Sequence, residues 1–183
     1  MIHRLIPILL LSLLASPVLQ AATLLVANKS EASLSLLSIP GFQEIARLPT
    51  GPGPHEVAVS PDGKRALVSN YGLRKQPGNT LSLVDIPGAA ILATIELPDG
   101  ARPHGVEWLD DQRAVVTAEG LRQLLVVDAD QREITQSIAV DQEIAHMVAA
   151  DPVAARAYTA NIGSGSVSVV DLSLIHISEP TRR

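Results

Sequence analysis

Cysteine is absent from this 183-residue chain, and aromatic residues make up only 2% of it. Without cysteine, the chain has no disulfide, no thiolate metal site and no C-x-x-C-H motif for haem attachment. With so few aromatic side chains, a core must be built from Val, Leu, Ile and Ala. The chain is nevertheless 46% hydrophobic and 18% charged, which is typical of a globular protein.

Basic residues are fewer than acidic ones, with 14 Lys and Arg against 19 Asp and Glu, so the formal net charge is −5. The central part of the chain contains no basic block, so the electrostatic footprint of a general DNA-binding protein is missing. We therefore expect no nucleic-acid partner. The sequence also lacks a Ser-His-Asp order, a glycine-rich phosphate loop and an H-E-x-x-H motif. Enzyme activity stays open, with the sequence leaning against it and indicating no catalytic residue.

Residues 1–22 have the pattern of a secretory signal peptide. A short positive start precedes an almost wholly apolar run from Leu5 to Ala15, and small residues follow at Ala21 and Ala22. A run this short cannot cross a bilayer core of about 30 Å as a helix. We therefore predict a periplasmic or secreted protein without a membrane span after cleavage. The alternative is an uncleaved anchor.

The last segment, residues 172–183, reads LSLIHISEPTRR and breaks the pattern of the region before it. It resembles the translation of a transposon-end sequencing adapter. We therefore expect an artefactual tail that packs poorly. The alternative is a genuine strand followed by a basic tail.

A repeat occupies residues 23–171 and determines the expected fold. Its copies begin PHEVAVSPDGKR, PHGVEWLDDQR and AHMVAADPVAAR, and each continues with two β-rich runs. The second run of each copy ends in Asp85, Asp128 or Asp171, which are 43 residues apart. Short Val/Leu/Ile runs bounded by Gly, Pro, Asn and Asp indicate strands joined by tight turns.

Four short strands in each repeat of about 40–50 residues match the spacing of β-propeller blades. We predict an all-β fold of four-stranded antiparallel blades at residues 23–50, 54–98, 103–140 and 145–171. The first blade is expected to lack its innermost strand and the last its outermost strand. The chain would then hold about 3.5 blades of an incomplete ring. We expect such an incomplete ring to self-associate through its open edges, or to dimerise into a closed ring.

The segments GPHEVAVSPDGKRALVSN and RAYTANIGSGSVSVVD resemble the YVTN family of propeller repeats. The resemblance covers about residues 23–171. It implies a complete ring of about seven blades, of which this chain would hold about 3.5. The third predicted blade, residues 103–140, departs from the family pattern at residues 109–111 and 118–120. The resemblance implies a propeller but no single activity, because propellers host unrelated chemistries.

Three histidines occupy one position of the repeat, just before the innermost strand, namely His55, His104 and His146. In a propeller this position lies around the mouth of the central channel. Neutral imidazoles that converge there are suited to a metal ion, a non-covalent haem or an anion. The alternative is that histidine is the residue the repeat prefers, with its ring hydrogen-bonded to the neighbouring blade.

Residues 71–79 are predicted to form a longer loop on the same face as the histidines. Tyr71, Arg74 and Lys75 in this loop would meet an anionic ligand near His55. The alternative is a solvated insertion without a partner.

Further polar residues lie on or at the ends of strands. Glu107 lies on an innermost strand with its side chain opposite to those of its neighbours, so we expect it to line the channel and to contact water. Asn70, Glu119 and Asn161 are assigned to the ends of equivalent strands, where they line a site or cap turns.

These features favour an exported binding or scaffold propeller. Its unidentified ligand, a small molecule or a protein, would sit over the channel mouth on the histidine face. One alternative is a hydrolase of the propeller lactonase type, although known lactonase propellers with such repeats are mainly cytosolic. The other is a redox-associated propeller that binds a metal or non-covalent haem through its ring of histidines.

Overall fold

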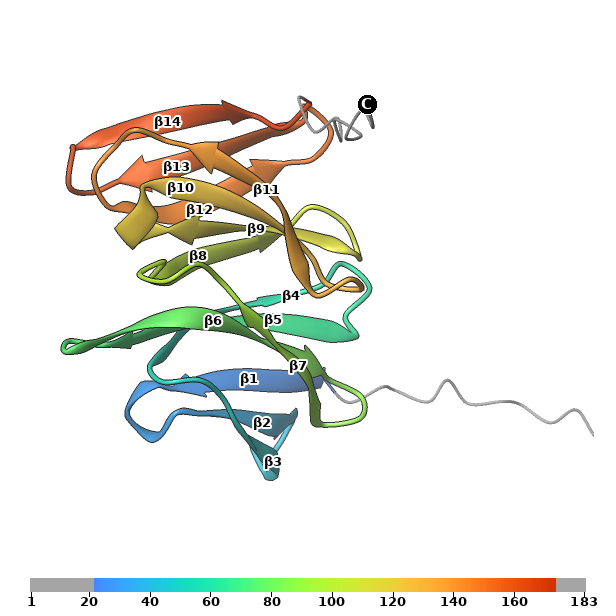
Figure 1. Ribbon diagram of the computed structural model, residues 1–183. Helices are drawn as coiled ribbons and strands as arrows, with labels where there is room; N and C mark the ends of the chain where they lie inside the picture. Colours follow the sequence, from blue (N-terminus) through green and yellow to red (C-terminus); the bar gives the residue numbers. More distant parts are fainter. Residues whose placement is uncertain (1–21, 174–183) are drawn as a thin grey trace, which may run out of the picture.

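The computed structural model describes residues 22–173, and within that range it contains fourteen strands and two short 3-10 helices. The predicted signal segment before Ala22 lies outside the described residues, as does the tail after Ser173. The strands form four antiparallel sheets that follow one another in chain order (Figure 1). The all-β prediction is therefore confirmed. No helix within the described range is long and apolar enough to cross a membrane.

Each sheet is built from consecutive strands. The first sheet contains β1 (Ala22–Asn28), β2 (Ser33–Ile39) and β3 (Glu44–Pro49). The second contains β4 (Pro54–Val59), β5 (Arg65–Leu73), β6 (Gln76–Asp85) and β7 (Ala90–Glu96). The third contains β8 (Pro103–Trp108), β9 (Arg113–Ala118), β10 (Gln123–Asp128) and β11 (Glu133–Ala139). The fourth contains β12 (Ala145–Asp151), β13 (Arg156–Asn161) and β14 (Ser166–Asp171). The helices η1 (Lys29–Glu31) and η2 (Glu119–Leu121) join β1 to β2 and β9 to β10.

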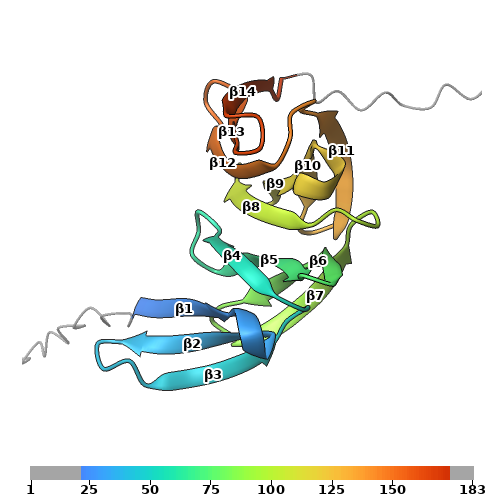
Figure 2. The same ribbon diagram turned by 90° about the vertical axis from the view of Figure 1, so that its left-hand side faces the viewer.

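The first strands of the later sheets lie next to one another. β4 contacts β8, and β8 contacts β12. Figure 2 shows β4, β8 and β12 one above another, with β5–β7 and β9–β11 to their right and β13 and β14 above β12. Strand β1 pairs Asn28 with Ser33, just as β5 pairs Asn70 with Thr80. Strand β1 is therefore the counterpart of β5, and the described part of the first sheet has no counterpart of β4.

Apolar side chains fill the spaces between consecutive sheets. On β5, Val68 packs toward the first sheet while Leu67 packs toward the third. On β9, Val116 packs toward the second sheet and Val115 toward the fourth. Successive side chains of a strand point to opposite faces. Both faces of these strands are buried, which explains why their sequences are nearly continuous apolar runs.

The recurrent aspartates end β6, β10 and β14, as their 43-residue spacing predicts, and each lies opposite an arginine at the start of the second strand. Their carboxylates accept hydrogen bonds from backbone N–H groups of the turns that follow. The residue after each aspartate donates its backbone N–H to the preceding turn, in the pairs Ile86 to Lys64, Ala129 to Gln112 and Leu172 to Ala155.

Leu172 corrects the predicted boundary of the repeat. Its side chain is only 4% exposed and packs in the cluster between the third and fourth sheets. The expectation that everything after Asp171 packs poorly is therefore wrong for this residue. The Leu172 backbone is hydrogen-bonded in the same way as those of Ile86 and Ala129. Its side chain therefore packs between sheets, as those of Ile86 and Ala129 do.

Candidate functional site

Each of the three histidines lies at a β-bulge in the first strand of its sheet. The pairing register shifts between Pro54 and Val57 in β4, between Pro103 and Val106 in β8, and between Ala145 and Met147 in β12. A bulge places two residues opposite one, bends the strand and re-aims the side chain. The repeated bulge therefore gives His55, His104 and His146 equivalent settings in three successive sheets.

A hydroxyl group on β9 holds the bulge of β8 in place and links it to the next sheet. Thr117 Oγ1 accepts a 2.8 Å hydrogen bond from the backbone N–H of Gly105 and donates a 2.7 Å bond to the backbone oxygen of His146. A Cβ atom on Gly105 would lie 2.8 Å from that same oxygen. Glycine at this position therefore allows β8 and β12 to approach closely, which sets His104 beside His146.

The three imidazoles form a continuous row, here called the histidine row (His55, His104 and His146). The ring centroids of His55 and His104 are 4.2 Å apart, and those of His104 and His146 are 3.6 Å apart. The Tyr71 ring lies 5.4 Å from both His55 and His104 and meets His104 edge-on. The structure thus brings together all three predicted histidines and Tyr71.

His104, at the centre of the row, is only 1% exposed. Neither of its ring nitrogens has a hydrogen-bond partner among the described residues. The expected hydrogen bond to a neighbouring blade is therefore not formed by His104. Burial, reinforced by the nearby His146 and His55, lowers the pKa of His104 to about 4. The ring is therefore neutral at neutral pH and keeps a free nitrogen lone pair.

The Glu119 carboxylate lies at the His146 end of the histidine row. Glu119, whose side chain is 6% exposed, contacts His146 Nδ1 through Oε1. Its second oxygen, Oε2, accepts a 2.7 Å hydrogen bond from the Tyr71 hydroxyl. Burial and the Glu119 carboxylate raise the pKa of Tyr71. The guanidinium of Arg102 lies 4.4 Å from the Tyr71 ring centroid, and the Lys29 ammonium 5.3 Å from it.

The placement of Glu119 corrects the sequence assignment. On β9 the residue opposite the start of β10 is Ala118, which corresponds to Asn70 and Asn161 in their sheets. Glu119 follows as the first residue of η2, at the position that Tyr71 occupies after Asn70. The signal was present in the sequence, because Ala118 precedes Asp128 by as many residues as Asn161 precedes Asp171.

Asparagine at equivalent positions of β1, β5 and β13 has a structural role in three sheets. Its side-chain amide donates to two hydroxyl groups on the strand that follows in the chain, with N···O distances between 2.9 and 3.2 Å. The sets are Asn28 with Ser33 and Ser35, Asn70 with Thr80 and Ser82, and Asn161 with Ser166 and Ser168. Asn70 and Asn161 therefore brace neighbouring strands.

The predicted loop at residues 71–79 is instead a β-hairpin that extends β5 and β6. Gly72 pairs with Pro77 and Leu73 with Gln76, so only Arg74 and Lys75 form the turn. Both residues are exposed at the hairpin tip. Among the residues that the structure describes, no hydrogen bond or salt bridge joins them to the histidine row. The binding of an anionic ligand by Arg74 and Lys75 near His55 therefore stays a prediction.

Glu107 is exposed on β8, whereas its neighbours Val106 and Trp108 are buried. The expected exposure to water is therefore observed. Within residues 22–173, however, no hydrogen bond or salt bridge connects Glu107 to the histidine row. Its place in a shared site stays a prediction.

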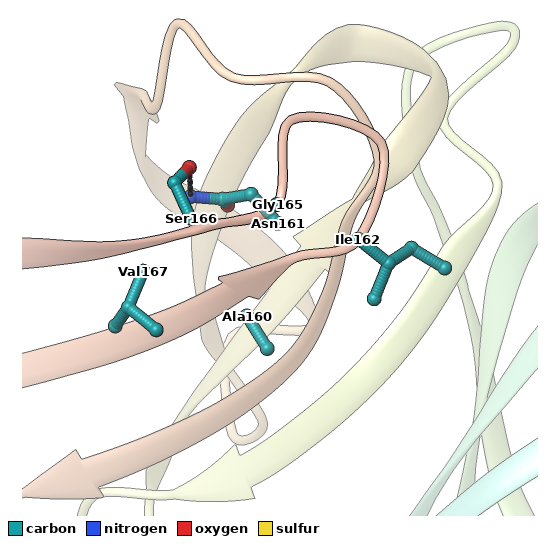
Figure 3. A pocket seen from close by; sticks show the side chains of 6 residues that line it. All are labelled: Ala160, Asn161, Ile162, Gly165, Ser166 and Val167. Carbon is teal, nitrogen blue, oxygen red and sulfur yellow. Dashed lines mark hydrogen bonds between the residues drawn. The ribbon is translucent and has the colours of Figure 1, made fainter.

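Two surface depressions lie at this end of the fourth sheet. One is lined by Tyr71, Arg102, Glu119, His146 and Ile162, together with Gly120 and Ile144, and it opens onto the end of the histidine row. The other is lined by Ala160, Ile162 and Val167, with Asn161 and Ser166 hydrogen-bonded to each other (Figure 3). The second depression is mainly apolar and its polar side chains are already paired, so the first has the richer chemistry.

Comparison with known proteins supports the fold alone. No family model and no curated protein matches the chain. Among solved structures, the chain is similar to hydrazine synthase of Kuenenia stuttgartiensis, with 24% sequence identity and a TM-score of 0.72. The match covers 86% of this chain and 45% of that one. This chain therefore spans less than half the length of the matched chain.

Proposed function

We propose that the chain forms consecutive blades of a YVTN-type β-propeller and acts as an exported binding module with its ligand on the face of the histidine row. The propeller assignment is supported by four antiparallel sheets in chain order and by contacts between their first strands. It is also supported by features that recur at equivalent places. A bulge lies in the first strand of the second, third and fourth sheets, and an aspartate ends the third strand of each.

The observation that carries the binding role is the state of His104. A buried polar atom without a hydrogen bond costs free energy, on the order of 1–3 kcal/mol, so most native structures pair such groups. Within residues 22–173, both ring nitrogens of His104 are unpaired, and its neighbours in the row are two further imidazoles. A ligand that supplies a partner for one of these nitrogens would recover that free energy.

The described residues favour binding over covalent hydrolysis. A hydrolase with a covalent intermediate needs a nucleophile within hydrogen-bond reach of its base. Within residues 22–173, no serine or threonine hydroxyl hydrogen-bonds to any imidazole of the histidine row. The imidazoles instead contact Glu56 beside His55 and Glu119 beside His146. Glu119 in turn accepts a hydrogen bond from the Tyr71 hydroxyl.

The test is a titration of the full chain, labelled with 15N-histidine, with inorganic phosphate, hemin or Zn²⁺. A binding module is expected to show saturable shifts of the His104 ring signals with at least one of these probes. His104→Gln identifies the His104 signals and should abolish the response. Unchanged signals with all three probes would overturn the proposed function.

A further inference from the structure

We infer that His104, Glu119 and His146 form a site for a divalent transition-metal ion of the zinc class, an inference that rests on the proposed binding function of this face. The three side chains offer one ligand atom each, and these atoms all lie within 4.8 Å of one another. They come from β8, η2 and β12, so the ion would join the third and fourth sheets.

The geometry needs only a small adjustment to hold an ion. Zinc binds imidazole nitrogen and carboxylate oxygen at about 2.0–2.2 Å, which separates neighbouring ligands by roughly 3–3.6 Å. Glu119 Oε1 and His146 Nδ1 are now in direct contact, so the ion would enter between them and replace the shared proton. That proton moves to the other ring nitrogen or to solvent, because a ligating imidazole nitrogen must carry its lone pair.

His104 provides independent evidence for a ligand. It is 1% exposed and neither ring nitrogen is hydrogen-bonded among the described residues. Metal ligation would satisfy one of these nitrogens without adding a hydrogen-bond donor to the core. Thr117 fixes the backbone of β12 relative to β8, so His104 and His146 are held in position before an ion arrives.

Tyr71 supports the carboxylate from outside the proposed ligand set. Its hydroxyl donates to Glu119 Oε2 and leaves Oε1 directed to His146. Such hydrogen bonds orient metal ligands, and their loss costs about 10–100-fold in metal affinity. Arg102 and Lys29 lie over the Tyr71 ring. Their charge opposes a bare cation and favours an anion as a further ligand of the bound ion.

The donor set determines the class of metal. Two imidazoles and one carboxylate suit Zn²⁺, Co²⁺ and related ions, whereas Mg²⁺ and Ca²⁺ prefer oxygen ligands only. Three protein ligands leave at least one open coordination position. That position would face the depression lined by Tyr71, Arg102 and Ile162.

A rival ligand set exists at the other end of the row. His55, Glu56 and His104 also bring their ligand atoms within 4.8 Å of one another. The His55 and Glu56 side chains, however, are 31% and 34% exposed and are sequence neighbours joined by a 3.3 Å contact. The buried Glu119, held by Tyr71 from another sheet, is the better organised carboxylate. The two sets share His104, so the carboxylates distinguish them.

The test is calorimetric titration of the metal-free full chain with Zn²⁺, together with the visible spectrum of bound Co²⁺. Glu119→Gln keeps the shape of the side chain and should weaken the site at least about 100-fold. Glu56→Gln is the matched control and should leave its affinity unchanged. Tyr71→Phe should weaken binding about 10-fold or more. Histidine ring signals of the unmodified chain give a second measurement, in which Zn²⁺ should perturb His104 and His146.

The outcomes separate this inference from the proposed function. If Glu56→Gln loses the site and Glu119→Gln keeps it, the metal belongs to the rival set and the inference is overturned. If neither Zn²⁺ nor Co²⁺ binds while phosphate or hemin shifts the His104 signals, the inference also fails but the binding function stands. If no probe acts on His104, both fail.

Discussion

Tyr71 and Glu119 are 48 residues apart in the chain, and the Tyr71 hydroxyl donates a 2.7 Å hydrogen bond to Glu119 Oε2. Each residue directly follows one of the equivalent positions Asn70 and Ala118, which lie in the second and third sheets. The contact therefore crosses from one sheet to the next beside the histidine row. The form of the candidate site depends on how neighbouring sheets are spaced, in addition to the fold of each sheet.

Replacing Tyr71 with Phe removes this hydrogen bond and leaves the aromatic ring. We expect the free energy of unfolding to fall by about 1–3 kcal/mol, because the acceptor is a buried carboxylate. Urea unfolding of the metal-free chain measures the change. Tyr158→Phe is the matched control, since its hydroxyl makes no hydrogen bond within the described residues. Equal losses for the two variants would contradict the proposed importance of the contact.

Gly53 lies just before the first bulge, in the left-handed region at φ +63°, and a Cβ atom there would come within 2.3 Å of the backbone oxygen of Gly72. Gly63 has a similar φ of +73° but open space around it. Gly63→Ala should therefore cost about 1 kcal/mol, from backbone conformation alone. Gly53→Ala adds a clash with backbone and should cost at least about 2 kcal/mol more. Thermal unfolding of both variants tests the difference, and similar costs would show that the clash is relieved.

Asn70 is fully buried and its amide group bonds the hydroxyls of Thr80 and Ser82. Asn70→Ala leaves both hydroxyls without this partner and should lower the free energy of unfolding by about 1–3 kcal/mol. Asn79→Ala is the control, because the Asn79 amide makes only long hydrogen bonds of 3.4 and 3.5 Å. A chemical denaturation series should rank the two variants in this order. The reverse order would argue against the bracing role of Asn70.

His104 should titrate with a pKa of about 4 in the folded, metal-free protein, below the value of 6.5 for an unperturbed imidazole. The unfolded chain then takes up a proton at a higher pH than the folded chain does. The contribution of neutral His104 to the free energy of unfolding is therefore fully present above pH 6.5 and is lost as the pH falls through about 4. Ring signals followed by NMR give the pKa directly. A His104 that titrates near 6.5 would show that its ring is hydrated.

The sequence was sufficient to predict the strands and the common position of the histidines, because the repeat fixes both. The bulge that orients His55, His104 and His146 lies in the repeated segments that form β4, β8 and β12. The two errors near the site arose where the third and second sheets depart from the repeat. Ala118 replaces asparagine, which shifted the alignment of Glu119, and residues 71–79 pair as a hairpin despite their proline and glycines.

The unpaired state of His104 could not be predicted from the sequence. It depends on the distance between β8 and β12, which is set by Gly105 and by the Thr117 hydrogen bond across the sheets. The role of Glu119 also could not be predicted, because its partners Tyr71 and His146 belong to the second and fourth sheets, on either side of its own. Contacts between sheets follow from packing geometry and leave no periodic signal in the chain.

Trp108 is the only tryptophan in the sequence, and it lies in the contact between the second and third sheets. Its indole N–H donates a 2.9 Å hydrogen bond to the backbone oxygen of Ala58, and the Arg65 guanidinium lies 5.7 Å from the centre of its ring. Fluorescence excited selectively from tryptophan in the unmodified chain therefore reports on one sheet contact alone. A red shift of its emission would register water entering between these two sheets, even while the strands of each sheet stay paired.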